Sequence, residues 1–198
     1  LLGALGFMFG TGGSALIAKS MGEGDSEKAQ AQFSLFVYVA LAGGIVLMML
    51  GLLGLRPVAM LLGAEGAMLE DCVLYGRIIL YALPAYVLQY AFQAFFVAAE
   101  KPKLGLAVTV AAGLTNMVLD ALLVAVIPLG LVGAALATAL AQVVGGILPL
   151  IYFALPNTSR LRLGKTRWNS RWLGQVCLNG SSELMSNISM PLVGMLYN

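Results

Sequence analysis

Long apolar stretches alternate with short polar turns along this chain. Four of them can be followed from end to end, at residues 30–55, 72–99, 104–128 and 131–155. Each has the roughly 20 or more residues that a tilted membrane-spanning helix needs. Two further apolar stretches lie at the ends, from residue 1 and from residue 172 onward. The pattern predicts an all-α membrane protein, a polytopic helix bundle, and we expect the chain to be a fragment of a larger transporter-sized protein.

The composition supports a location in the membrane. Of the 198 residues, 60% are hydrophobic and 10% are charged, which is more apolar surface than a soluble domain of this length can bury. With helices of alternating direction, Arg56 and Arg77 fall on one side and the other nine of the 11 Lys and Arg residues on the opposite side. By the positive-inside rule, the turns near Gly22, Lys101 and Arg160 face the cytoplasm. We therefore predict a multi-pass protein of the cell (inner) membrane.

Other classes of protein are not favoured. The basic residues are scattered over several loops without an aromatic-lined groove, so no nucleic acid partner is predicted. Cys72 and Cys177 lie near opposite ends of their helices and are not expected to pair. Residues 22–25 match the Gly-x-Gly-Asp of intramembrane aspartyl proteases, but this Asp lies in a charged turn and not at membrane depth. We predict that the protein is not an enzyme.

Polar residues indicate where helices begin and end. Asp25 is predicted to cap the second helix, with Glu27 in the first turn, where the helix dipole favours an acid. Arg56 and Pro57 are expected to end that helix. The turn at residues 128–130 is so short that the two helices flanking it must be antiparallel neighbours.

One apolar stretch, residues 104–128, contains both an amide and a carboxylate. Asn116 and Asp120 are four residues apart and therefore share one face of a helix. An acid within a membrane-spanning helix costs about 2.5 to 3.5 kcal/mol on insertion scales, so a partner must compensate for it. This pair is our candidate functional site.

Depth can be counted from the tight turn at Leu129. Asp120 lies nine residues before Leu129 and Thr138 nine residues after it, so the two side chains are predicted at one depth. The same count pairs Asn116 with Gln142. Taken alone, Thr138 is more simply interpreted as a hydroxyl bonded to the carbonyl one turn back. Its depth match with Asp120 favours a role in the site.

Further polar residues lie at membrane depth. Gln89 and Gln93 share a face near the middle of their helix, where interhelical hydrogen bonding and a cavity lining are both consistent with the pattern. Residues 156–170 are the most polar stretch and are predicted to be a linker at the inner surface. In the last helix Glu183 and Asn187 lie one turn apart and repeat the pairing of acid and amide.

The motifs in chain order resemble those of a known transporter family. A Gly-x-Gly-Asp-x-Glu-x-Ala turn follows a Gly-rich helix, a Glu-Lys-Pro-Lys turn precedes Asn-Met-Val-Leu-Asp at residues 116–120, and residues 130–138 run Gly-Leu-Val-Gly-Ala-Ala-Leu-Ala-Thr. In this order and spacing they resemble multidrug and toxic compound extrusion (MATE) transporters, closest to the prokaryotic branch. The likeness covers essentially the whole chain.

The resemblance implies a place within a twelve-helix transporter of two six-helix lobes. Residues 1–155 would be helices two to six of the N-terminal lobe, with the first helix missing. Residues 156–170 would be the cytoplasmic linker between lobes, and residues 171–198 the truncated first helix of the C-terminal lobe.

The resemblance also implies a cation site. The family uses an Asp on helix one, an Asn and an Asp one turn apart on helix five, and a Thr on helix six. The last three fall on Asn116, Asp120 and Thr138, which would be the metal ligands if the ion is Na⁺. A helix-seven Glu, implicated in coupling in some members, matches Glu183. Together with Glu183, the shared face of Gln89 and Gln93 is a candidate for the coupling or substrate cavity.

By this resemblance the function is cation-coupled antiport that exports organic, mostly cationic drugs or toxic compounds by alternating access. Three oxygen ligands suit Na⁺, whereas a proton site needs only the carboxylate, so both coupling ions stay open. No cofactor beyond the ion is expected. The expected partners are small organic substrates and the lipid bilayer, with no protein partner predicted.

Two alternatives are weighed against export of drugs. A flippase for a lipid-linked or saccharide precursor tends to carry several basic residues at membrane depth, and here only the peripheral Arg77 comes near it. A channel or non-transporting scaffold would use Asp120 only to bond Asn116 and Thr138 between helices. Such bonds average about 0.6 kcal/mol, too little to offset an ionised acid. A protonated Asp120 escapes that objection.

Overall fold

The computed structural model describes the backbone of residues 3–196 and the side chains of residues 3–190, 193 and 194. Over this range the chain is helical, with short turns and one longer connection at residues 155–169, and contains no strand. The elements are α1 (Ala4–Gly22), α2 (Ser26–Leu61), α3 (Gly66–Ala98), α4 (Pro102–Asp120), the π-helix η1 (Ala121–Val126), α5 (Gly130–Ala154) and α6 (Ser170–Leu196). Four units, α2, α3, α4 with η1, and α5, are long and apolar enough to cross a membrane. The predicted all-α, multi-pass architecture is confirmed.

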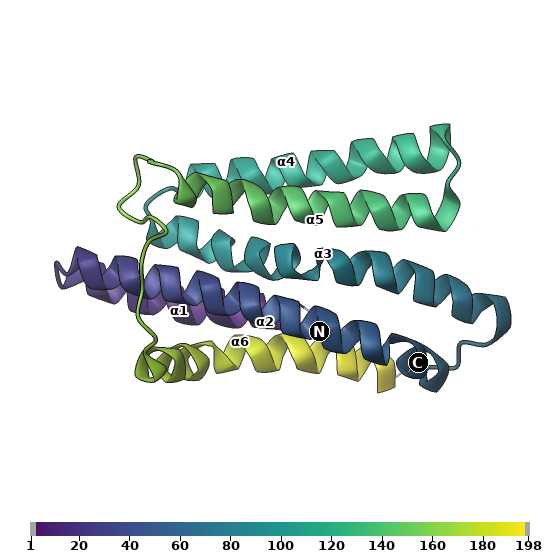
Figure 1. Ribbon diagram of the computed structural model, residues 1–198, viewed down its shortest axis with the longest axis horizontal. Coiled ribbons are helices and arrows are strands. Elements are labelled where there is room, and N and C mark those ends of the chain that lie inside the picture. The colour runs from purple at the N-terminus through teal and green to yellow at the C-terminus, as the bar shows by residue number, and fades with distance from the viewer. Residues whose placement is uncertain (1–2, 197–198) are drawn as a thin grey trace.

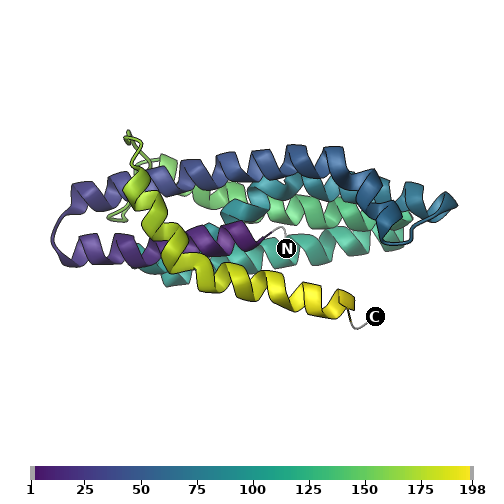
Figure 2. The ribbon, with the colours of Figure 1, turned by 90° about the horizontal axis from the view of Figure 1, so that it is seen from below.

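The helices lie side by side in a bundle, with α4 and α5 forming a hairpin at one edge (Figure 1). Helix α5 packs on α3, which in turn packs on α1 and α2. Helix α6 packs on α1 and runs obliquely to the other helices (Figure 2). A Cβ atom at Gly12 would collide with the Val176 carbonyl oxygen, and one at Gly180 with that of Met8. The crossing of α1 and α6 therefore requires glycine on both helices.

The first turn of α2 forms as predicted. Gly24 adopts a φ of +81°, which a residue with a side chain rarely adopts, and reverses the chain after α1. The Asp25 carboxylate then accepts a hydrogen bond from the Lys28 backbone amide at 3.0 Å. This cap satisfies one of the amides that a helix start leaves without an intrahelical partner.

The predicted end of α2 at Arg56 and Pro57 is wrong. The helix continues through Pro57 to Leu61, and the Leu62 amide still donates to the Val58 carbonyl at 3.0 Å. A proline removes only its own amide donor, and the bonds made after it can continue the helix. Arg56, just before the proline, forms an exposed ion pair with Glu70 of α3 at 2.9 Å.

Aromatic side chains fill the bundle at the end where α1 meets α2. Phe33 of α2, Phe92 and Phe95 of α3, and Phe153 of α5 are each at most 1% exposed. Their ring centroids lie 4.9 to 6.4 Å apart. This dry cluster joins three helices and fixes how α3 and α5 approach each other.

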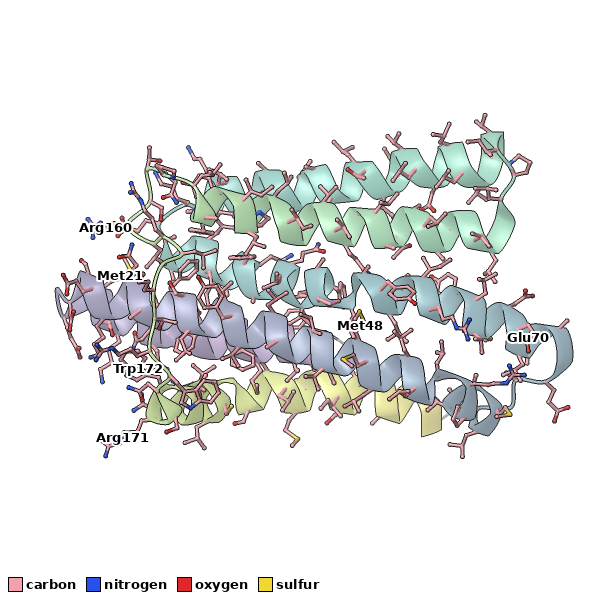
Figure 3. All side chains as sticks on the ribbon, in the orientation of Figure 1. Met21, Met48, Glu70, Arg160, Arg171 and Trp172 are labelled. Carbon is pink, nitrogen blue, oxygen red and sulfur yellow. The ribbon has the colours of Figure 1, made fainter. Side chains whose placement is uncertain are left out.

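Charged groups separate between the two ends of the bundle. Figure 3 places Arg160, Arg171 and Trp172 at one end and Glu70 at the other. Residues 155–169 cross the first of these ends as the non-helical connection between α5 and α6. The distribution agrees with the count of basic residues on which the predicted orientation depends.

Candidate functional site

A cavity of about 270 Å³ lies where α3, α4 and α5 meet. All three helices contribute polar side chains to its wall, and small residues on α4 and α5 leave the space between them. The lining residues are Tyr86, Gln89, Thr109, Ala112, Gly113, Asn116, Thr138, Ala141 and Gln142. Three of the predicted site residues, Gln89, Asn116 and Thr138, therefore meet at one cavity.

The hydroxyl of Thr138 differs from those of the threonines on α4. Thr109 donates to the Gly105 carbonyl at 3.0 Å and Thr115 to the Ala111 carbonyl at 2.8 Å, the local bond typical of a helical threonine. Within the described residues Thr138 makes no such bond. Its hydroxyl remains available to a ligand in the cavity.

Two amide oxygens at the cavity are buried without a hydrogen-bond partner among the described residues. They are Oε1 of Gln89 and Oε1 of Gln142. Gln89 lies directly against α5 at Gly145, where an added Cβ atom would come within 2.6 Å of the Gln89 Cδ atom. A buried acceptor without a donor costs about 1 to 3 kcal/mol. Such oxygens are suited to hold a cation or an ordered water.

Asp120 lies beside this cavity, one helical turn beyond Asn116, and does not line it. Its side chain is half-buried and has no ion-pair partner in the part of the chain that the structure describes. It is the last residue of α4, and η1 begins at Ala121. The structure thus brings Asn116 and Thr138 together at a cavity and places the acid at its edge.

The π-helix that follows Asp120 is packed tightly against α5. The Ile127 amide donates to the Leu122 carbonyl at 2.9 Å, the five-residue spacing of a π-helix. A Cβ atom at Gly133 would come within 2.6 Å of the Leu123 carbonyl oxygen. π-helical turns occur frequently at functional sites. The hydrogen-bond spacing of the helix therefore changes immediately after Asp120.

The remaining predicted residues lie elsewhere. Gln93, one turn from Gln89, is half-buried but does not line this cavity. Glu183 is exposed on α6, which packs on α1 and not on α4 or α5. Its backbone carbonyl, and not its carboxylate, accepts a hydrogen bond from the Asn187 side chain at 2.8 Å. The structure does not bring Glu183 to Asn116 and Thr138.

Tyr86 and Gln142 are among the lining residues that are absent from the predicted site. Gln142 is given by the depth count from Leu129, which pairs it with Asn116. Tyr86 lies three residues before Gln89, so the two share a helical face. Its hydroxyl donates to that of Tyr90 at 3.2 Å. A search of the face that carries Gln89 would have found it.

The chemistry that this wall offers is neutral oxygen donors with one acid nearby. The described residues contain no group of three or more His, Cys, Asp or Glu side chains that could hold a metal ion. A cation here would depend on amide and hydroxyl oxygens, which favour hard ions such as Na⁺ over transition metals.

Comparison with known proteins gives a consistent picture. The model of the MatE family matches residues 1–122, more than half of the chain. Curated relatives include the multidrug export protein MepA of Staphylococcus saprophyticus, 27% identical over 199 residues, and that of Staphylococcus aureus strain MRSA252, 27% identical over 202 residues. Both alignments cover the whole chain and 44% of the relative. The chain thus spans less than half the length of the curated relatives it matches.

Solved structures show the same fold. An inward-facing structure of a multidrug resistance MATE family transporter of the MOP superfamily aligns with a TM-score of 0.90, and an outward-facing one with 0.88. A MOP superfamily transporter from Pyrococcus furiosus also aligns with 0.88. Each is 22% identical and covers 96% of this chain, and the chain covers 43 to 44% of each.

Proposed function

This chain belongs to the MatE family of MATE transporters, and we propose that it works as part of a cation-coupled antiporter that exports organic, mostly cationic compounds across the inner membrane by alternating access. Relatives that carry the name multidrug export protein support this choice of activity. The choice of a cation as coupling partner is supported by the cavity between α3, α4 and α5.

One observation carries the proposal. Asn116 and Thr138, from two different helices, line the same cavity, and Asp120 lies one turn from Asn116 at its edge. Gln89 and Gln142 add two further oxygens without partners in the described chain. A purely structural polar contact between helices would satisfy these groups with one another. A cation site instead leaves their oxygens facing the ion.

The coupling step follows from the cost of charge within the membrane. A carboxylate in a low-dielectric environment is costly unless it is protonated or paired with a cation. Ion binding at Asp120 and the cavity oxygens would lower that cost in one arrangement of the helices more than in the other. An ion that binds one conformation better shifts the equilibrium toward that conformation. We assign Na⁺ to the site, because the oxygens of Asn116 and Thr138 would be superfluous for a proton alone.

Inside-out vesicles provide the test of this function. The native protein should accumulate a fluorescent organic cation, such as ethidium, when Na⁺ is higher in the vesicle lumen, which corresponds to the cell exterior, than in the outer solution. Asp120→Asn should abolish accumulation at unchanged protein level. Asp71→Asn is the matched control, because Asp71 is exposed in the polar first turns of α3. Accumulation by Asp120→Asn at the native rate would remove Asp120 from the mechanism, and a flat response to both Na⁺ and pH gradients would favour the non-transporting scaffold.

A further inference from the structure

A second and larger hollow lies at the basic end of the bundle, away from the cation cavity. It has a volume of about 680 Å³ and lies between the start of α2 and the α5–α6 connection. Its wall includes Ala31 of α2, Lys165, Arg167 and Trp168 of the connection, and Trp172 from the first turn of α6. None of these side chains has a part in the proposed transport cycle.

The wall of this hollow is held in place by hydrogen bonds between the connection and α2. The Thr166 hydroxyl donates to the Ala31 carbonyl at 2.7 Å. Two residues earlier, the Gly164 amide donates to the Ser34 hydroxyl at 3.0 Å. The connection is therefore tied to a membrane-spanning helix at two points, and the hollow between them is preformed.

The charge of the hollow is positive and uncompensated. Lys165 and Arg167 are exposed, and the lining contains no acidic residue. In the described part of the chain, ion pairs within 4.0 Å form at Lys28, Arg56 and Arg160. Lys165 and Arg167 form none, so their charges are free to bind an anion.

The aromatic residues indicate what kind of anion fits. Trp168 is 73% exposed, and Trp172 beside it is half-buried. Tryptophan is enriched at the boundary between headgroups and hydrocarbon, where its ring is apolar and its N–H polar. Figure 3 shows Trp172 beside Arg171 at the basic end of the bundle. A ligand for this hollow therefore has a negative head and an apolar body.

We propose that this hollow binds the headgroup of an anionic phospholipid. Lys165 and Arg167 bind its phosphate, and the rings of Trp168 and Trp172 lie along its glycerol and upper acyl chains. Basic pockets beside membrane-spanning helices on the cytoplasmic side are suited to such headgroups. The bound lipid would fasten the α5–α6 connection to the membrane surface.

The chain offers a direct probe, because Trp168 and Trp172 are its two tryptophans. The protein is reconstituted in phosphatidylcholine vesicles, and Trp fluorescence is followed as phosphatidylglycerol brominated near the headgroup end of its acyl chains replaces part of the lipid. Brominated phosphatidylcholine is the reference. Quenching should show phosphatidylglycerol bound on the order of tenfold more tightly than phosphatidylcholine, given roughly fivefold for each cation near an anionic surface before screening.

Two charge-matched double variants decide whether the preference belongs to this hollow. Lys165→Gln with Arg167→Gln should bring the two lipids to within about twofold of each other. Lys101→Gln with Lys103→Gln removes the same charge from the α3–α4 turn and should leave the preference intact. Because Lys165 and Arg167 are exposed, the first variant should fold, and the native emission maximum checks that it does. Equal quenching of the native protein by both lipids, or an equal loss in the two variants, would overturn the proposal.

Discussion

Two groups of buried polar side chains in this bundle differ in whether their hydrogen bonds are satisfied. Near the turn between α1 and α2, the Ser20 hydroxyl donates to Gln32 Oε1 at 2.9 Å, and both residues are at most 2% exposed. Where α3, α4 and α5 meet, Oε1 of Gln89 and Oε1 of Gln142 are buried with no donor among the described residues. The first pair is closed and complete. The second pair of oxygens has no hydrogen-bond donor among the described residues, and both residues line a cavity.

This difference distinguishes a structural contact from a candidate binding site, in a bundle where nearly all other fully buried side chains are apolar. The Ser20–Gln32 hydrogen bond beside the aromatic cluster positions α1 against α2, and neither group remains free to bind a ligand. Unsatisfied oxygens cost stability and are retained only where something else gains from them. Helix α3 joins both kinds of environment, since Gln89 lies three residues before Phe92 of the cluster.

The largest loss of stability is expected for a substitution in the aromatic cluster. Phe92→Ala should lower the free energy of unfolding by about 3 kcal/mol, because Phe92 is 1% exposed and packs against Phe33 and Phe153. Thermal unfolding in detergent measures the change. The exposed Val97→Ala, on the same helix, is the control and should lie within about 0.5 kcal/mol of native. Equal losses in both variants would mean that the cluster is not the core of the bundle.

A smaller loss is expected when the closed polar pair is broken from one side. Gln32→Leu should cost about 2 kcal/mol of stability, because the buried Ser20 hydroxyl loses its acceptor. Adding Ser20→Ala to Gln32→Leu should recover part of that loss, since no buried donor then remains. The same denaturation measurement serves, and an undiminished loss in the double variant would deny that the pair acts as a unit.

At the cavity between α3, α4 and α5, a substitution should change transport and not stability. Thr138→Ala should lower cation-driven efflux about tenfold, the equivalent of about 1.4 kcal/mol for one lost oxygen ligand to a charged species. Thr115→Ala makes the same chemical change on α4, where the hydroxyl is bonded to the Ala111 carbonyl, and should leave efflux near native. If the two variants behaved alike, the free hydroxyl of Thr138 would have no special role.

The smallest change in stability is expected for Gln142→Leu, which gives the clearest comparison with Gln32→Leu. Gln142→Leu should leave the free energy of unfolding within about 0.5 kcal/mol of native or raise it, because an apolar residue replaces a buried oxygen that lacks a donor. Efflux should nevertheless fall. A loss of stability as large as that of Gln32→Leu would place Gln142 among the structural contacts and not in the site.

Much of the architecture follows from the sequence because a bilayer sets the length of its helices. Apolar stretches separated by short polar turns predict the spans, and the tight turn at Leu129 fixes which residues of α4 and α5 share a depth. Asn116 and Gln142, which that count pairs, both line one cavity. Of Asp120 and Thr138, which it also pairs, only Thr138 lines it. Asp25 was likewise predictable, because a cap depends only on neighbouring residues.

Other features could not be predicted, since they depend on packing between helices. The sequence of η1 contains only apolar residues, and nothing in it distinguishes five-residue from four-residue hydrogen-bond spacing. The sequence therefore does not show that Asp120 is the last α-helical residue before a change of helix type. Past Pro57, α2 is packed on α3, where Ala59 is buried in a small cluster with Leu69 and Val73. Glu183 lies away from the cavity because α6 crosses α1, an arrangement that composition does not specify.

Binding of radioactive sodium to the purified protein tests most directly whether the cavity oxygens hold a cation. The native protein should bind Na⁺ saturably, Asp120→Asn should abolish binding, and Asn116→Ala with Thr138→Ala should weaken it at least about tenfold, while Thr115→Ala leaves it unchanged. Native-strength Na⁺ binding by the Asn116 and Thr138 double variant would contradict the assignment of the site to this cavity.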